Sequence, residues 1–276
     1  MECLCPILGR QTEVDVFDAS HEPWVLVRCR QTGFVFLSNP PDYSRLTDEF
    51  AWEKTWAEEK TRRARAEPLF TKVSGLSKRV KLTLFPHRNK FYSLLCSVMP
   101  GHSPVAILDI GCGKGELLEG ICQRFAQLNR PVIPLGVEIS RQLAAMSGEK
   151  FSALGGRVIF SNAIDGVSQL SPDEVDVVIM SSFLEHEAKP RELLIALRSG
   201  LKSTGRVILK VPNFACWNRG FRGMRWCGFR FPDHVNYFSP RTLGILAEQA
   251  GYRVARQNLL DRWPLSDNMY AVLAPV

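Results

Sequence analysis

The stretch VAILDIGCGKG, residues 105–115, is the part of this chain that decides its fold. An apolar run containing one acid, Asp109, is followed by three glycines at every second position and then by a Leu-rich helical pattern. Glycine adopts backbone angles that other residues avoid, and it lets a ligand approach the bare main chain. The pattern predicts a strand, a tight turn and a helix whose free N–H groups face an anionic group.

A second apolar run, residues 131–137, leads into Glu138, whose two oxygens can accept hydrogen bonds from both hydroxyls of a ribose. Two such strands joined by a glycine turn and a helix predict a nucleoside-binding βαβ unit. The glycine spacing is G-x-G-x-G, whereas dinucleotide sites use G-x-G-x-x-G. Asp109 would repel a pyrophosphate and suits an ammonium group, so we expect a ligand with an amine, a carboxylate and a ribose.

S-adenosylmethionine fits that description better than NAD. The segment LDIGCGKG, residues 108–115, resembles the first motif of the class I S-adenosylmethionine-dependent methyltransferases. The alternative is an α/β domain whose glycine turn binds nothing. The resemblance covers residues 105–276 well and implies S-adenosylmethionine as cofactor. The cofactor contacts that it implies are Asp109, Gly111, Gly113, Glu138, Ile139, Asn162, Ala163 and Ser181.

The segment SNAID, residues 161–165, stands where this family often has an acid that accepts from the adenine amino group. Asn162 can accept through its carbonyl oxygen and also donate from its amide to a ring nitrogen. Asp165 could perform the same role, and Asn162 could instead be an ordinary turn residue.

From residue 105 onward, predicted strands and helices alternate, which predicts an α/β doubly wound sheet with right-handed crossovers. The last part of the chain reads as a hairpin of two further strands. The resemblance supplies the full arrangement, a seven-stranded Rossmann-like methyltransferase sheet with an antiparallel last strand. We therefore divide the chain into a small N-terminal β ribbon at 1–45, a basic helical cap or linker at 46–100 and an S-adenosylmethionine-binding domain at 101–276.

The bulk properties are those of a globular protein, with 276 residues and 45% hydrophobic side chains. The sequence contains no run of eighteen apolar residues, so we expect no membrane span. The N-terminus does not resemble a secretory signal. The eight cysteines are scattered, and several lie in apolar elements, which favours reduced thiols in the cytoplasm. Nothing in the sequence sets the oligomeric state.

The net charge of +7 is concentrated in residues 60–90, which hold ten Lys or Arg and one acid, Glu67. A solvated helical face explains such a segment most simply. Attraction to an anionic glycan, a lipid surface or a nucleotide-linked acceptor is the second interpretation, and it allows peripheral membrane contact. RNA binding is the third, since the sequence shows no RNA-module motif beyond charge.

The first 45 residues resemble a zinc ribbon that has lost half of its ligands. CPILG at 5–9 and CRQTG at 29–33 look like two zinc knuckles in which Leu8 and Thr32 replace the second cysteine. Structural zinc takes four ligands, and only Cys3 or His21 could complete the set. The favoured interpretation keeps the strands and replaces the metal by packing of aromatic residues, namely Trp24, Phe34 and Phe36.

Two histidines are candidates for the base that an oxygen acceptor requires. The segment SSFLEHE, residues 181–187, is similar to the ubiquinone-type O-methyltransferases, which end this segment in Glu-His. Those enzymes have a further acid where this chain has Ser182, so we expect no metal. His186 could instead cap the helix that follows. His234 lies in FPDHVNYFSP, residues 231–240, which resembles a loop of bacterial small-molecule and sugar methyltransferases; we favour it as the base, with Tyr237 as its neighbour, although it could simply fix the loop.

The long connection at 213–230 carries four arginines and no acid, and its aromatic residues include Trp217, Phe221, Trp226 and Phe229. One interpretation is a lid whose aromatic residues cover the acceptor and whose arginines meet its negative charge. Stacking on single-stranded nucleic acid would use similar residues. An amphipathic helix packed on the domain, with solvated arginines, is the third interpretation.

Together these features predict methyl transfer from S-adenosylmethionine to a small-molecule, sugar or lipid-linked acceptor at a hydroxyl group. An RNA methyltransferase is the alternative enzyme, because of the basic segment. A methyltransferase-like binding protein without catalytic activity is the alternative outside enzymes. The aromatic and basic residues alone do not identify the acceptor.

Overall fold

The structure is a computed structural model and describes residues 1–18, 20, 22–41 and 90–276. The chain divides into two compact units, residues 1–40 with 98–276, and residues 41–97. In the second unit the described part is chiefly α4 (Lys90–Val98), a short amphipathic helix. Most of the expected helical cap, most of the basic segment 60–90 and His21 lie outside the described residues.

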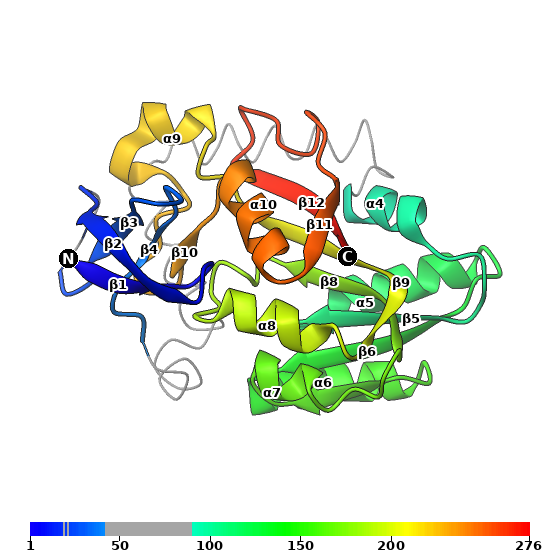
Figure 1. The fold of residues 1–276 in the computed structure, drawn as a ribbon. Helices are drawn as coiled ribbons and strands as arrows, with labels where there is room; N and C mark the ends of the chain where they lie inside the picture. The colour runs from blue at the N-terminus through cyan, green and yellow to red at the C-terminus, as the bar shows by residue number, and fades with distance from the viewer. Residues whose placement is uncertain (19, 21, 42–89) are drawn as a thin grey trace. The chain divides into compact units, whose positions relative to one another are not determined.

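The larger unit is built on a seven-stranded sheet with the order β11-β12-β9-β8-β5-β6-β7 (Figure 1). Strands β7, β6, β5, β8 and β9 are parallel, whereas β12 is antiparallel to both β9 and β11. This confirms the predicted methyltransferase sheet with its antiparallel last strand. The strands are β5 (Val105–Ile110), β6 (Val132–Glu138), β7 (Arg157–Phe160), β8 (Val175–Ser181), β9 (Leu201–Pro212), β11 (Tyr252–Arg256) and β12 (Asn268–Pro275).

Helices cover both faces of this sheet, as a doubly wound fold requires. Helices α5 and α6 contact each other, while α8 contacts both α7 and α10. Because both faces are covered, the central strands are buried almost throughout, and in β8 every residue but the last is buried. The helices are α5 (Glu116–Ala126), α6 (Arg141–Ser152), α7 (Ala163–Val167), α8 (Pro190–Leu197), α9 (Trp217–Arg222) and α10 (Pro240–Gln249), with a 3-10 turn η1 (Gly223–Arg225).

A second sheet joins the N-terminal ribbon to the carboxyl-terminal half of the chain. Its order is β1-β2-β3-β4-β10, and β10 pairs with β4 in antiparallel register. The ribbon therefore shares one sheet with the segment that follows His234. The strands are β1 (Glu2–Cys5), β2 (Arg10–Val16), β3 (Leu26–Cys29), β4 (Val35–Leu37) and β10 (Asn236–Tyr237).

Aromatic packing fills the ribbon where the sequence suggested a lost zinc site. Phe34 and Phe36 are buried and stack with ring centroids 5.8 Å apart, and Phe34 also meets Phe238 at 5.1 Å. Cys5 and Cys29 are both fully buried and hydrogen-bond to each other. Burial raises the pKa of the Cys5 thiol to about 11, which favours the protonated form over the thiolate that binds metal.

Candidate active site

The glycine turn lies at the carboxyl end of β5, where open α/β sheets bind ligands. Gly111, Gly113 and Gly115 have φ angles of 72°, 54° and 75°, a left-handed conformation that disfavours other residues. Gly115 is the N-cap of α5. A Cβ atom on Gly113 would meet nothing within 4 Å, so the space beside this residue is open to a ligand.

Glu138 ends β6 beside this turn and is only 7% exposed. One of its carboxylate oxygens accepts from the backbone N–H of Gly113 at 2.8 Å, and the other accepts from Ser140 at 2.9 Å. These bonds fix the carboxylate against the turn. A carboxylate offers about four acceptor positions, so the group can accept more hydrogen bonds than these two. The predicted role of Glu138 therefore fits its geometry.

Asp109 stands inside the sheet beside Gly136 and is 3% exposed. Burial and the nearby Glu138 carboxylate raise its pKa to about 8. Within the described residues no hydrogen bond reaches its carboxyl group. Two acidic groups, Asp109 and Glu138, therefore converge on the glycine turn. Such a pair suits a ligand that carries an ammonium group and a ribose, and the residues fit S-adenosylmethionine.

In the segment expected to bind adenine, Asn162 and Asp165 make hydrogen bonds to each other. Asn162 is the N-cap of α7, and its side-chain oxygen accepts from the backbone N–H of Asp165 at 3.0 Å. Its amide nitrogen donates to the Asp165 carboxylate at 2.6 Å. Asp165, the alternative to Asn162 as the adenine-binding residue, is exposed, whereas Asn162 is half-buried. Ile139 and Ser181 are half-buried at the ends of their strands, and Ala163 is buried.

The segment after β8 folds back toward the glycine turn. Ser182 adopts a left-handed conformation, with φ at 57°, which turns the chain at the strand end. The next side chain, Phe183, packs so tightly on Gly111 that a Cβ atom there would lie 2.5 Å from the ring. This contact explains why the first glycine of the turn is required, and it places the following residues near the cofactor edge of the sheet.

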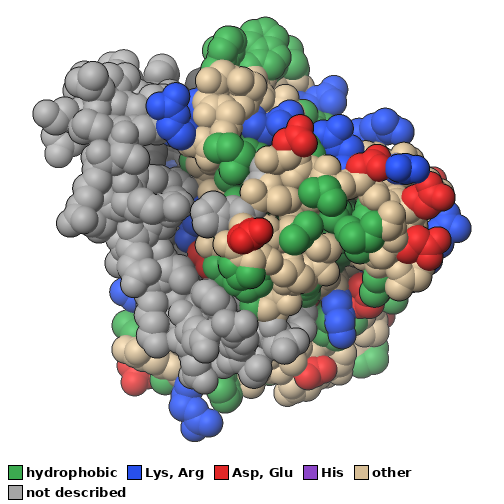
Figure 2. All heavy atoms as spheres, turned by 90° about the vertical axis from the view of Figure 1, so that its left-hand side faces the viewer, with side chains coloured by type: hydrophobic (Ala, Val, Ile, Leu, Met, Phe, Trp, Pro, Cys, Tyr) green, Lys and Arg blue, Asp and Glu red, His purple; other side chains and the backbone are tan. Residues whose placement is uncertain are grey.

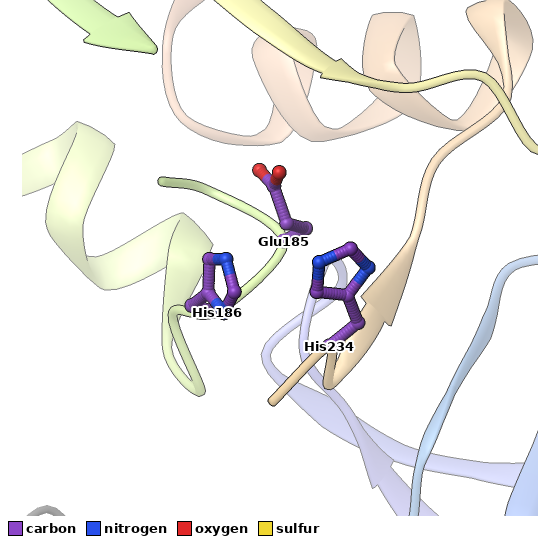
Figure 3. Close-up of side chains that lie close together, drawn as sticks. All are labelled: Glu185, His186 and His234. Atoms are coloured by element: carbon purple, nitrogen blue, oxygen red, sulfur yellow. The ribbon is translucent and has the colours of Figure 1, made fainter. Parts of the chain in front are cut away.

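Glu185, His186 and His234 come together in one cluster (Figure 3). Glu185 and His186 lie between β8 and α8, whereas His234 comes from the segment before β10. Their ligand atoms all lie within 4.8 Å of one another. The two imidazoles meet edge to face, with centroids 4.7 Å apart. The fold thus unites the two histidines that the sequence proposed as alternatives.

Backbone carbonyls orient both imidazoles in the same way. Nδ1 of His186 lies 2.8 Å from the carbonyl oxygen of Asp233, and Nδ1 of His234 lies 2.8 Å from that of Gly228. A carbonyl oxygen only accepts, so Nδ1 carries the proton in each neutral ring. Each Nε2 then offers a lone pair, which can accept a proton or bind a metal.

The charges around the cluster distinguish its members. Burial is the main cause that lowers the pKa of His186 to about 4 and raises the pKa of Glu185 to about 7. Arg230 also acts on both groups, and it is itself paired with Asp233 at 2.8 Å. One oxygen of Glu185 is buried without a hydrogen-bond partner. His186 is therefore neutral at pH 7, and Glu185 titrates near it.

Two nitrogens and one carboxylate oxygen also form a set that a divalent cation accepts. The sequence argument expected no metal because Ser182 replaces an acid. Here His234, from a different element, supplies a third ligand. The positive charge of Arg230 beside the cluster acts against a cation. The expectation of no metal stays a prediction.

Sequence reasoning missed the residue that connects the two halves of this cluster. Asn236 is 2% exposed, and its amide nitrogen donates to the carbonyl oxygens of Leu184 at 3.1 Å and of Glu187 at 2.6 Å. The backbone N–H of Asn236 also donates to the Glu185 carbonyl. A buried asparagine two residues after a candidate base was the signal available in the sequence.

Tyr237, the expected neighbour of His234, lies outside the three-residue cluster. It is 2% exposed and packs in a core group with Phe214 and Phe229. Burial raises the pKa of its hydroxyl, which is buried without a hydrogen-bond partner. The assignment of Tyr237 as a site residue stays a proposal.

The aromatic residues of the 213–230 connection separate into two groups. Trp226 and Phe229 are buried in the same core as Tyr237, and the Trp226 indole N–H donates to Asp267 at 2.9 Å. Trp217 and Phe221, on α9, are 60% and 82% exposed. The predicted lid is therefore partly core and partly surface.

Comparison with known proteins supports this class of fold. The model of the family described as "Methyltransferase domain" matches residues 60–257. A solved S-adenosylmethionine-dependent methyltransferase from Clostridium acetobutylicum has a TM-score of 0.51 at 10% identity, covering 74% of this chain and 98% of that one. That likeness concerns the fold alone, and it agrees with a class I methyltransferase sheet.

Two curated relatives carry the name ubiquinone biosynthesis O-methyltransferase. The mitochondrial protein of Schizosaccharomyces pombe is 34% identical over 104 residues, which cover 37% of this chain and only 36% of that protein. The Aeromonas salmonicida protein is 27% identical over 169 residues, covering 58% of this chain and 68% of that protein.

Because the family model matches well over half of the sequence, the chain belongs to the methyltransferase-domain family. The resemblance to class I S-adenosylmethionine-dependent methyltransferases is confirmed, as is S-adenosylmethionine as the cofactor of this class. Within the described residues, no helix has both the length and the apolarity needed to cross a membrane.

Proposed function

We propose that this protein transfers the methyl group of S-adenosylmethionine to a hydroxyl of a small-molecule, sugar or lipid-linked acceptor in the cytoplasm. The observation that carries the proposal is the convergence of Asp109, the glycine turn and Glu138 at the carboxyl edge of the sheet. His186, which clusters with His234, follows the adjacent strand β8.

The cofactor side of the site binds and orients. Glu138 receives the ribose, the backbone at Gly113 leaves room for the ligand, and Asp109 faces the ammonium group. When bound, S-adenosylmethionine supplies an activated methyl group on a sulfonium. Because the reaction is an in-line displacement, the protein contributes mainly alignment and exclusion of water.

The acceptor side must remove a proton. His234 is buried, and its Nδ1 is held by the Gly228 carbonyl, so Nε2 receives the proton from the acceptor hydroxyl. The Glu185 carboxylate beside it stabilises the imidazolium that forms. His186, whose pKa is about 4, is a poorer base at neutral pH and orients the acceptor as a hydrogen-bond partner.

The class of acceptor rests on the names of the curated relatives. They are named as O-methyltransferases of ubiquinone biosynthesis, which favours oxygen on a small molecule. We therefore retain the small-molecule, sugar or lipid-linked acceptor. The RNA alternative depends on residues 60–90, which apart from Lys90 lie outside the described residues, and the labelling experiment below tests it.

The test uses the whole chain and S-adenosylmethionine with a labelled methyl group. A metabolite, glycan and lipid extract is fractionated, and each fraction is incubated with the wild type and with His234→Ala. We expect one fraction to become labelled by the wild type only, while both proteins bind the cofactor in calorimetry. Label found only in RNA, or cofactor binding without any labelled fraction, would refute the proposal.

A further inference from the structure

Exposed apolar side chains gather in two short segments outside the catalytic cluster. Of the 17 large hydrophobic side chains that are exposed in the described residues, seven lie in residues 217–224 and 259–265. Such side chains scattered singly need no explanation, whereas a concentration marks a binding surface. The seven are Trp217 (60%), Phe221 (82%), Met224 (51%), Leu259 (59%), Leu260 (72%), Trp263 (46%) and Leu265 (52%).

Hydrogen bonds hold the two segments together as one surface. The backbone N–H of Trp217 donates to the carbonyl oxygen of Pro264 at 2.8 Å, and the Asn218 amide donates to that of Leu265 at 2.9 Å. Asp267, at the end of the second segment, accepts from both Asn218 and Trp226. Figure 1 shows α9 and the β11–β12 connection on the same side of the molecule.

Helix α9 presents its apolar side chains to solvent rather than to the protein. Trp217 and Phe221 stand four residues apart in α9, which places them on one face of the helix, and Met224 follows in η1 after the chain turns at Gly223. No residue of α9 is buried. The helix is anchored by backbone bonds and by Asn218, so its aromatic residues are not used for the stability of the fold.

The charge on this surface is positive. Arg262 is exposed within the second segment and Arg225 is exposed directly after the first, and Figure 2 shows Lys and Arg side chains beside exposed hydrophobic ones at the top of that face. The acids nearby are engaged inward: Asp261 is buried and binds Arg256, and Asp267 holds Trp226. Apolar side chains interleaved with arginines match a membrane interface that carries anionic headgroups.

We propose that α9 and the 259–265 turn form a membrane-docking surface that inserts Trp217, Phe221, Leu260 and Trp263 at the interface of a bilayer rich in anionic lipid. A lipid surface was one option in the second interpretation of the basic segment at 60–90; the surface proposed here is a different one and includes an apolar component. The proposal does not depend on which acceptor is methylated.

Sedimentation with vesicles tests the proposal. Vesicles of phosphatidylcholine with about a third phosphatidylglycerol should bind the full chain, whereas pure phosphatidylcholine should bind it weakly. Trp217→Ser/Phe221→Ser should lower the partition coefficient about tenfold or more, because two large apolar side chains no longer insert. The matched control Leu4→Ser/Leu128→Ser changes residues of 57% and 56% exposure elsewhere and should bind like the wild type.

Quenching separates insertion from attraction by the basic segment. Brominated lipids in the same vesicles should quench the tryptophan fluorescence of the wild type. Trp217→Phe/Trp263→Phe should still sediment with the vesicles but lose most of that quenching. The proposal is overturned by binding that is unchanged in the serine variant, by quenching that survives the phenylalanine variant, or by failure of the wild type to bind. Since none of these readouts uses turnover, they do not depend on the proposed reaction.

Discussion

The imidazoles of His186 and His234 meet edge to face with ring centroids 4.7 Å apart, although 47 positions in the sequence separate His186 from Asp233, whose carbonyl it binds. The Asp233 carbonyl accepts from His186, and its neighbour His234 is bound in turn to Gly228. One loop therefore orients both rings. The two alternatives of the sequence argument become members of one cluster.

His234→Ala should lower turnover by about a hundredfold or more while the affinity for S-adenosylmethionine stays unchanged, because general base catalysis typically contributes about 10²–10⁴-fold. Single-turnover kinetics and calorimetry measure the two effects separately. His186→Ala should have a smaller effect, since a group with a pKa of about 4 is a weak base.

The same assay tests whether a metal takes part. Treatment with a chelator should leave wild-type turnover unchanged, because Arg230 occupies the surroundings of the cluster. Loss of activity on chelation, with recovery by one divalent cation, would instead identify Glu185, His186 and His234 as metal ligands.

Glu185 should make the protein less stable as the pH rises from about 5 to 7. Its pKa is about 7 in the folded chain and near 4.5 in an unfolded one, so the folded state binds more protons between these values. The free energy of unfolding then falls with increasing pH. Urea unfolding at pH 5 and pH 7.5 should show this fall reduced in Glu185→Gln. Equal pH dependence in both proteins would show that Glu185 titrates normally.

The sequence predicted the sheet well because the pattern there is strong and local. Buried parallel strands read as continuous apolar runs, and β5, β6 and β8 do so. The glycine turn and Glu138 lie within 28 residues of each other, so a single βαβ unit fixes their relation. These parts were predictable without knowledge of the tertiary structure.

The acceptor side depends on contacts that no local pattern contains. Asn236 bridges to Leu184 and Glu187 across about fifty residues, and β10 pairs with the N-terminal ribbon. Tyr237 was expected beside the base, yet its strand position places the ring in the core. The sequence predicts a single lid over residues 213–230, because composition cannot distinguish the buried Trp226 from the exposed Trp217.

Glu138→Ala should weaken S-adenosylmethionine binding about tenfold or more, since hydrogen bonds to charged groups contribute about 1.5–3 kcal/mol each. Calorimetry measures the affinity. The variant also loses the bonds to Gly113 and Ser140, so the unfolding midpoint must be followed in parallel. Glu119→Ala, which removes a partly exposed acid paired with Lys150, is the matched control and should bind normally. Unchanged affinity in Glu138→Ala would remove this residue from the site.

Asp109 should make cofactor affinity rise with pH up to about 8. Below that pH its carboxyl group is protonated in the free protein, so a cationic ligand that needs the carboxylate must displace a proton. The affinity should therefore increase between pH 6 and 8, by at most about tenfold per pH unit. In Asp109→Asn this dependence should be lost. Methylthioadenosine lacks the amino-acid tail and should show little pH dependence with either protein; a slope with this analogue would exclude Asp109 as its source.

Gly111 and Gly113 should fail in different ways when each is replaced by alanine. Both have positive φ angles, so each substitution costs about 1–2 kcal/mol of stability. Gly111→Ala also creates a clash with Phe183, and overpacking of this kind lowers the free energy of unfolding by about 1–3 kcal/mol more. Adding Phe183→Ala should recover part of that loss in the double variant. Gly113→Ala meets no protein atom, so its methyl group projects into the space reserved for ligand. Urea unfolding should therefore single out Gly111→Ala, whereas calorimetry with S-adenosylmethionine should show the larger loss of affinity, relative to stability, in Gly113→Ala. The reverse ranking would mean that the ligand does not lie against Gly113.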